Sequence, residues 1–142
     1  MLSFAAETRL ALIPIGVALL GLPCAAGASG ECDGLLGTWR NPKNSVHVEI
    51  VSCGSAMCGV VVWASDKAKA DAREEGTDPL IGINLLRDFI STGDRRWRGK
   101  VFVPDLGKTV TGTVEMTAPD TFRARSCALA ILCKTQDWKR IG

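Results

Sequence analysis

The sequence has no tyrosine and a single histidine, His47, among its 142 residues. His47 alternates with apolar residues, which predicts that it lies on the outer face of a strand. With only Glu49 beside it, it lacks the additional ligands that a metal ion would need. The chain also has no glycine-rich phosphate loop, no nucleophile at a strand–turn–helix elbow and no carboxylate pair at a spacing typical of acid–base catalysis. We therefore expect that the protein is not an enzyme and has neither a cofactor nor a metal site.

A strong excess of charge of one sign is missing as well. The formal net charge is +2, which is too small to indicate a nucleic-acid partner. No helix of useful amphipathic length is predicted. One long apolar run is present, at the N-terminus, and no other segment approaches the roughly 20 residues that a membrane-spanning helix needs. Nucleic acid is therefore not an expected partner.

The N-terminal run has the three parts of a secretory signal peptide. Met1–Arg9 carries one arginine, Leu10–Leu22 is almost entirely apolar, and Ala26–Ala28 offers small residues for cleavage. A retained membrane anchor is the alternative for this segment. We expect a signal peptide at residues 1–28 and a periplasmic or secreted chain of residues 29–142, which is long enough for one core and too short for two.

Eight segments of the exported chain have strand signals and are separated by turn residues. The period of two is clearest in Arg96–Val103, where Trp97, Gly99 and Val101 share one face. Because a flat eight-stranded sheet would expose two edges, we expect the sheet to close. The sequence thus predicts an all-β, eight-stranded antiparallel up-and-down barrel, with room inside for side chains or one small ligand. The predicted strands are Leu35–Asn41, Ser45–Cys53, Cys58–Ala64, Leu80–Arg87, Arg96–Val103, Lys108–Met116, Thr121–Cys127 and Cys133–Ile141.

The middle of the chain carries two further expectations. In the fourth strand, Ile81, Ile83 and Leu85 are predicted to share one face. The charged segment Ser65–Pro79 before it has two interpretations, a short helix capped by Ser65 or Asp66 and a solvated loop. The composition does not assign this segment a role.

The cysteines favour an oxidising compartment. Cys53 and Cys58 flank one predicted bend, and Cys127 and Cys133 flank another, where facing strands lie close enough for a disulfide. The alternative is a zinc site, but these spacings lack the paired C-x₂-C pattern typical of one. We expect two disulfides, Cys53–Cys58 and Cys127–Cys133, which support export. Cys32 is left over as a free thiol or an intermolecular link.

Two sets of residues resemble known proteins. Gly37-Thr38-Trp39, together with Arg140 on the last strand, resembles the lipocalin-like (calycin) pattern. In that pattern the Trp plugs one end of the barrel and an Arg from the closing strand packs across it. A guanidinium over an indole ring is a cation–π contact of about 0.5–2 kcal/mol. The resemblance implies this arrangement for Trp39 and Arg140.

A longer resemblance is to a bacterial exported family with a lipocalin-like barrel, the domain of unknown function twenty-one forty-seven. It extends from about Leu35 to Arg140, implies a fold and an exported location, and brings no catalytic residues. Gly37–Asn41 also resembles the first strand of the biotin-binding avidins, but the later strands do not follow and no tyrosine is present to contact such a ligand. The family resemblance is carried by Asp78–Gly82, Trp97–Lys108, Cys127–Cys133 and Gln136–Arg140.

The predicted barrel interior is the leading candidate site. We expect it to bind a small apolar or amphipathic molecule, because it combines apolar side chains with a few polar groups. The alternative is a filled core in which Gln136 and Arg140 are bonded to backbone carbonyls. A cavity of about 300 Å³ or more would favour a ligand. The predicted ligand-binding residues are Trp39, Trp97, Val101, Val114, Phe122, Gln136, Trp138 and Arg140.

A second function follows if the barrel is filled by its aromatic side chains. The protein would then interact with a cell-envelope component or a protein partner through its surface. One candidate surface is the apolar tip, Ala128–Leu132, whose plainer alternative is packing over the end of the barrel. The charged segment Ser65–Pro79 is a second candidate surface. The third is a basic stripe on the outer face, formed by Arg96, Arg98, Lys100, Arg123 and Arg125. The sequence does not predict the oligomeric state.

Overall fold

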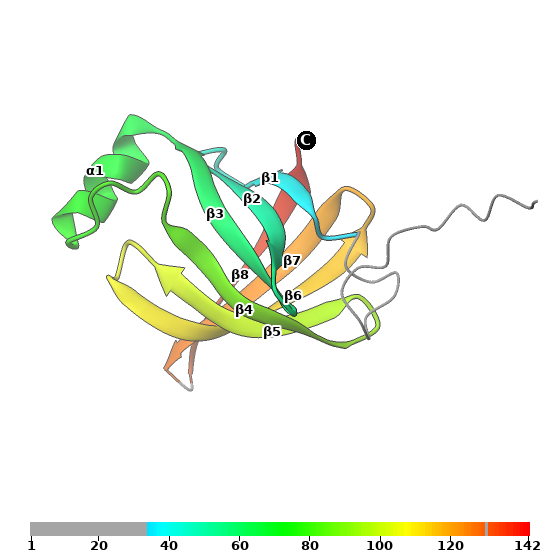
Figure 1. The fold of residues 1–142 in the computed structure, drawn as a ribbon. Helices are drawn as coiled ribbons and strands as arrows, with labels where there is room; N and C mark the ends of the chain where they lie inside the picture. Colours follow the sequence, from blue (N-terminus) through cyan, green and yellow to red (C-terminus); the bar gives the residue numbers. More distant parts are fainter. Residues whose placement is uncertain (1–33, 130) are drawn as a thin grey trace, which may run out of the picture.

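A computed structural model describes residues 34–129 and 131–142, so the predicted signal peptide and Cys32 lie outside the described residues. Eight antiparallel strands form a closed barrel in which every strand pairs with its neighbours in the sequence (Figure 1). The ring closes between the first and last strands, with Trp39 opposite Arg140. The predicted all-β up-and-down barrel is therefore confirmed. The elements are β1 (Gly37–Arg40), β2 (Val46–Cys53), β3 (Ala56–Ala64), α1 (Asp66–Glu74), β4 (Asn84–Gly93), β5 (Arg96–Val103), β6 (Lys108–Ala118), β7 (Thr121–Leu129) and β8 (Leu132–Arg140).

The up-and-down order places alternate connections at opposite ends of the barrel. We call one the closed end; it carries the β2–β3, β4–β5 and β6–β7 turns, the start of β1 and the end of β8. The other is the open end, with the β1–β2 loop, α1, the β5–β6 turn and the β7–β8 turn. Figure 1 shows α1 and the β5–β6 turn together at the left of the view, away from the C-terminus.

The alternation of inward and outward side chains that the sequence predicts is present from β5 to β8. Trp97 is only 3% exposed, whereas its neighbours Arg96 and Arg98 are exposed. Cross-strand pairing continues the inward row, because Trp97 lies opposite Val114 and Phe122 lies opposite Trp138. Buried apolar side chains of the strands therefore face inward and form one continuous core.

The fourth strand differs from its prediction. Leu80–Ile83 forms a turn, in which Gly82 has a φ of +92° and the Ile83 amide donates to the Leu80 carbonyl, and β4 begins only at Asn84. Ile81 is exposed, so the expected shared face of Ile81, Ile83 and Leu85 is wrong. The strand also departs from strict alternation, because its register shifts against β3 between Asn84 and Leu86 and against β5 between Arg87 and Ile90. Such an irregularity lets consecutive residues turn inward, and here Leu85 and Leu86 are both buried.

The charged segment before β4 contains a helix, which is the first of its two interpretations. The Ser65 hydroxyl accepts a hydrogen bond from the Ala68 amide at 3.1 Å and so caps α1. Ala72 is fully buried and fixes one face of the helix against the barrel. Within the described residues, no helix combines the length and apolarity that crossing a membrane requires.

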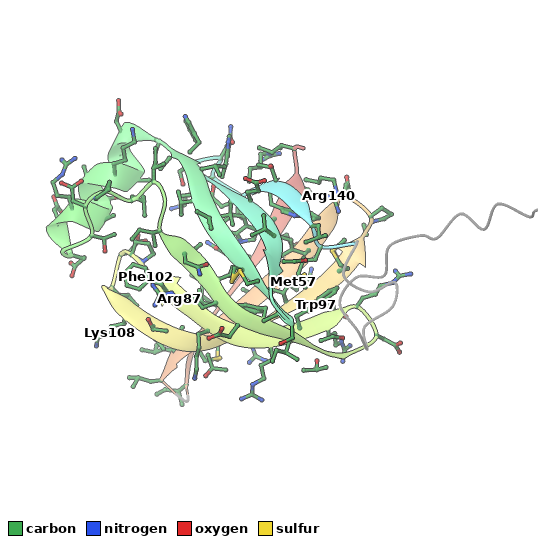
Figure 2. All side chains as sticks on the ribbon, viewed as in Figure 1. Met57, Arg87, Trp97, Phe102, Lys108 and Arg140 are labelled. Atoms are coloured by element: carbon green, nitrogen blue, oxygen red, sulfur yellow. A yellow bond between two sulfur atoms is a disulfide. The ribbon has the colours of Figure 1, made fainter. Side chains whose placement is uncertain are left out.

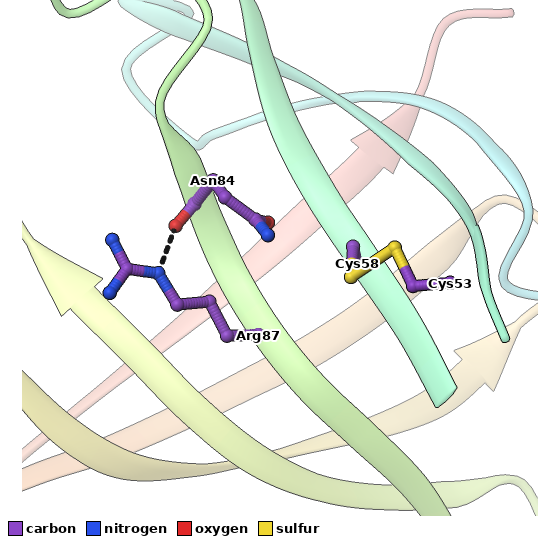
Figure 3. The surroundings of a disulfide bond; sticks show 4 residues. All are labelled: Cys53, Cys58, Asn84 and Arg87. Atoms are coloured by element: carbon purple, nitrogen blue, oxygen red, sulfur yellow. Dashed lines mark hydrogen bonds between the residues drawn. A yellow bond between two sulfur atoms is a disulfide. The ribbon is translucent and has the colours of Figure 1, made fainter. Parts of the chain in front are cut away.

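Both predicted disulfides are present, one at each end of the barrel. Cys53–Cys58 spans the β2–β3 turn at the closed end, with Cα atoms 5.8 Å apart, and lies beside β4 (Figure 3). Cys127–Cys133 joins directly opposed residues of β7 and β8 near the open end, with Cα atoms 4.0 Å apart. Each links two strands close to their turn, and such bonds are typical of proteins in oxidising compartments.

Candidate binding cavity

Aromatic side chains fill the barrel toward its closed end. Trp39 is fully buried, and its ring centroid lies 4.8 Å from that of Phe122 in an edge-on contact. Phe122 in turn stacks on Trp138, with centroids 5.8 Å apart and ring planes 9° from parallel. The indole nitrogen of Trp39 donates to the Leu35 carbonyl at 3.0 Å, so its one polar group is satisfied. These three rings form a plug across the barrel.

Arg140 covers this plug from outside. Its guanidinium carbon lies 4.2 Å from the centre of the Trp39 ring, and its nitrogens donate to the carbonyls of Leu36 and Gly34 at 2.7 and 2.5 Å. Figure 2 shows Arg140 beside the C-terminus, on the side of the barrel away from Phe102 and Lys108. Gly37 makes room for this contact, because a Cβ there would lie 2.6 Å from an Arg140 nitrogen and its φ is +129°. Arg140 is therefore a structural residue of the closed end.

Beyond the plug, toward the open end, the barrel contains a cavity of about 240 Å³. Trp138 and Phe122 form its floor. Its opening lies among the β1–β2 loop, the start of α1, the β5–β6 turn, the end of β7 and the start of β8. The barrel is thus filled at one end and hollow at the other. The apolar wall residues are Val46, Val48, Leu85, Leu86, Val101 and Ala124.

Gln136 places a polar group in this apolar wall. It lies opposite Ala124 in the β7–β8 pair, and both residues line the cavity. In the part of the chain that the structure describes, its amide makes no side-chain hydrogen bond, so its donors and acceptor are available to a bound molecule or to water. The filled-core alternative therefore describes Arg140, which is bonded to carbonyls, and does not describe Gln136.

Charged side chains surround the opening. On α1, the Lys67 ammonium lies 2.7 Å from an Asp71 carboxylate oxygen, and this hydrogen bond raises the pKa of Lys67 above its ordinary value. The pair is exposed and neutral overall. The remaining charges leave the rim with an excess of positive charge, because three cations face one anion and none of the four belongs to an ion pair among the described residues. The three cations are Lys43, Arg125 and Lys134, and the anion is Asp105.

The eight predicted ligand-binding residues divide between the two ends. Val101, Phe122, Gln136 and Trp138 line the cavity. The others do not, because they are packed in the core or, for Arg140, across the closed end. These are Trp39, Trp97, Val114 and Arg140.

Several lining residues were not predicted from the sequence. Ala124 could have been found, since it continues the inward row between Phe122 and Ser126. Leu86 could not, because strict alternation places it outside and only the irregular β4 register turns it inward. The residues that α1 and the β1–β2 loop contribute to the lining depend on how those connections fold over the opening. The alternation of side chains along a strand does not predict this.

The other predicted surface features are only partly available for binding. In the basic stripe, Arg96 lies 3.2 Å from Glu115 and Arg123 lies 2.8 Å from Asp137. His47 lies on the face of β2 opposite to buried Val48, as predicted. Its ring centroid lies 4.4 Å from that of Trp63, with the ring planes tilted by 34°, and burial, followed by the nearby Arg40 charge, lowers the pKa of His47.

These features define a lipocalin-like barrel with a cavity at one end. Residues 37–140 match the sequence profile of a family described as an uncharacterized protein conserved in bacteria, DUF2147, and the chain belongs to this family. Among solved structures, it resembles protein HP1028 from Helicobacter pylori, described as a member of the lipocalin family. The two share 21% sequence identity at a TM-score of 0.60, over 76% of this chain and 83% of the other. A comparison with curated proteins found no match. The lipocalin-like fold is confirmed.

Proposed function

We propose that the protein is a non-enzymatic carrier that binds one small amphipathic molecule at the open end of the barrel. The observation that carries this proposal is the cavity of about 240 Å³, which has an aromatic floor, aliphatic walls and a cationic rim. A molecule with an apolar chain and an anionic head group matches this gradient. Its chain would contact Trp138 and Val101, while its head group would lie near Lys134 and the Gln136 amide.

The cavity volume limits the size of the ligand. Small-molecule pockets usually measure about 300–1,000 Å³, so this cavity lies just below that range. It also lies below the roughly 300 Å³ that would favour a ligand. Because the opening is exposed to solvent, the whole molecule does not need to fit inside. We propose that a short apolar chain enters the cavity and that the polar part of the ligand stays at the rim.

The chemistry of the lining supports binding rather than catalysis. Among the described residues, neither histidine nor cysteine lines the cavity. Of its two carboxylates, Asp71 is held in its pair with Lys67 and Asp105 lies at the rim. Two disulfides favour an oxidising compartment. We propose a periplasmic or secreted location, in which a carrier would bind molecules of the cell envelope or its surroundings.

A pair of matched variants tests the proposal. Val101→Trp places an indole inside the cavity, whereas Val62→Trp makes the same change at an exposed position of β3. With decanoate as the probe, titration calorimetry should show binding to the wild type and to Val62→Trp, and at least tenfold weaker binding to Val101→Trp. Thermal unfolding of each variant shows whether it is folded. Equal binding by both variants, or no binding by the wild type together with an apo mass for protein purified from its own envelope, contradicts the proposal.

A further inference from the structure

The described residues of the apolar tip (Ala128–Leu132), which are 128–129 and 131–132, extend from the barrel at the open end instead of packing over it. Leu129 is 64% exposed, Ile131 87% and Leu132 60%, and these are the highest values of the large apolar side chains in the described part of the chain. The Cys127–Cys133 disulfide fixes the base of this turn. The packing alternative from the sequence is therefore wrong, and the tip presents three aliphatic side chains to the surroundings on a constrained hairpin.

Positive charge flanks the tip on both strands. Between residues 125 and 135 the charged residues are Arg125 and Lys134, and the segment has no acidic residue. Neither belongs to an ion pair among the described residues, whereas Arg123, further along β7, is paired with Asp137. The apolar tip thus combines exposed aliphatic side chains with flanking cations that have no ion-pair partner among the described residues. This composition is typical of a segment that enters the interface of an anionic bilayer.

We propose that the apolar tip docks the protein on an anionic lipid surface, with Leu129, Ile131 and Leu132 inserted at the boundary of the head groups and acyl chains. Arg125 and Lys134 then contact lipid phosphates. A protein partner fits these observations less well. Three side chains offer far less than the roughly 800 Å² per partner of a stable interface, and the tip lacks the aromatic residues enriched in such interfaces.

Docking in this way would bring one side of the cavity opening close to the lipid. The hairpin that carries the tip also supplies Arg125, Ser126 and Lys134 to the cavity lining. A molecule leaving the bilayer would therefore reach the opening without crossing the outer wall of the barrel. The docking surface does not depend on the proposed ligand, because the tip residues Leu129, Ile131 and Leu132 lie outside the cavity lining.

Vesicle flotation with the purified exported chain tests docking directly. We expect binding to vesicles that contain phosphatidylglycerol, weaker binding to vesicles of phosphatidylcholine alone, and loss of binding as salt is raised. The double variant Ile131→Ser/Leu132→Ser should bind the anionic vesicles at least tenfold more weakly. Ile90→Ser removes an apolar side chain that is 55% exposed on β4, away from the tip, and should bind like the wild type.

Charge variants separate the two parts of the surface. Lys134→Gln should weaken binding to anionic vesicles severalfold, while Arg95→Gln, at the closed end, should not. Decanoate binding by the double tip variant shows that its cavity is intact, so failure of docking and failure of the carrier proposal are distinguishable. Unchanged flotation of the tip variant contradicts docking. Docking is also contradicted if the wild type does not bind anionic vesicles and instead forms a dimer, or binds a protein, through the tip.

Discussion

The two ends of the barrel use similar residue types for different purposes. At the closed end, the side-chain nitrogens of Trp39 and Arg140 donate hydrogen bonds to backbone carbonyls. At the open end, the side chains of Gln136 and Lys134 have no hydrogen-bond or ion-pair partner among the described residues and lie beside a cavity. A polar group bonded within the fold contributes to stability, whereas one left beside a space can serve a ligand.

This contrast suggests how so small a barrel can be both stable and hollow. Its closed end packs three aromatic rings and is covered by a guanidinium. Its open end has mostly smaller side chains on the inward face, such as Ala124 and Ser126, where a cavity remains. Stability and binding should therefore respond to different substitutions.

The largest expected effect is at the plug. Trp39→Ala should lower the free energy of unfolding by about 4 kcal/mol, because it removes a fully buried indole and leaves a void. Phe102→Ala, at a partly buried aromatic of the open end, should cost about 1 kcal/mol. Urea denaturation followed by circular dichroism measures both. Similar losses would show that the two ends do not differ in this way.

Removing the disulfides one at a time compares the ends next. Cys53 and Cys58 are separated by 5 positions and Cys127 and Cys133 by 6, so the loop-closure contributions are nearly equal, at about 2 kcal/mol each. Cys58 is buried and Cys133 is exposed. The Cys53→Ser/Cys58→Ser variant should therefore lose more stability in thermal unfolding than Cys127→Ser/Cys133→Ser. The reverse order would mean that the open-end hairpin stabilises the barrel more than its exposure indicates.

Arg140 and Arg125 form a matched pair of single substitutions. Arg140→Gln removes the contact with Trp39 and the hydrogen bonds to carbonyls, and should cost about 2 kcal/mol. Arg125→Gln, which breaks no ion pair among the described residues, should change the free energy of unfolding by less than about 0.5 kcal/mol. The same denaturation experiment measures both. A cost at Arg125 as large as at Arg140 would contradict the division between structural and available cations.

The smallest effect is expected on the outer wall, which belongs to neither end. The hydrogen bond from Arg123 lowers the pKa of the Asp137 carboxyl. The pair therefore stabilises the fold above the ordinary carboxyl pKa of about 4 and loses this contribution as the pH falls through the lowered value. Both side chains are about half exposed, so the contribution is small. Melting temperatures of the wild type and Arg123→Gln, measured against pH, should differ slightly near neutrality and converge in acid.

The sequence was sufficient where side chains alternate regularly. It predicted the barrel, both disulfides and the inward row through Trp97, Val114 and Phe122. It failed at β4, because the turn at Gly82 and the shifted register after Arg87 depend on contacts with neighbouring strands. It also placed Trp39 and Gln136 in a single site. Alternation tells which face a residue occupies but not its height along the barrel, and height separates the plug from the cavity.

The four tryptophans allow the central claim to be tested in one titration. Trp138 is in the cavity floor, Trp39 is in the plug, Trp97 is in the core and Trp63 is on the outer face. Each indole N–H gives a separate signal in a two-dimensional ¹H–¹⁵N NMR spectrum. On addition of decanoate, the Trp138 signal should move together with the Gln136 side-chain amide, while Trp39 and Trp63 stay in place. Shifts centred on Trp39 or Trp63, with Trp138 unchanged, would contradict a binding site at the open end.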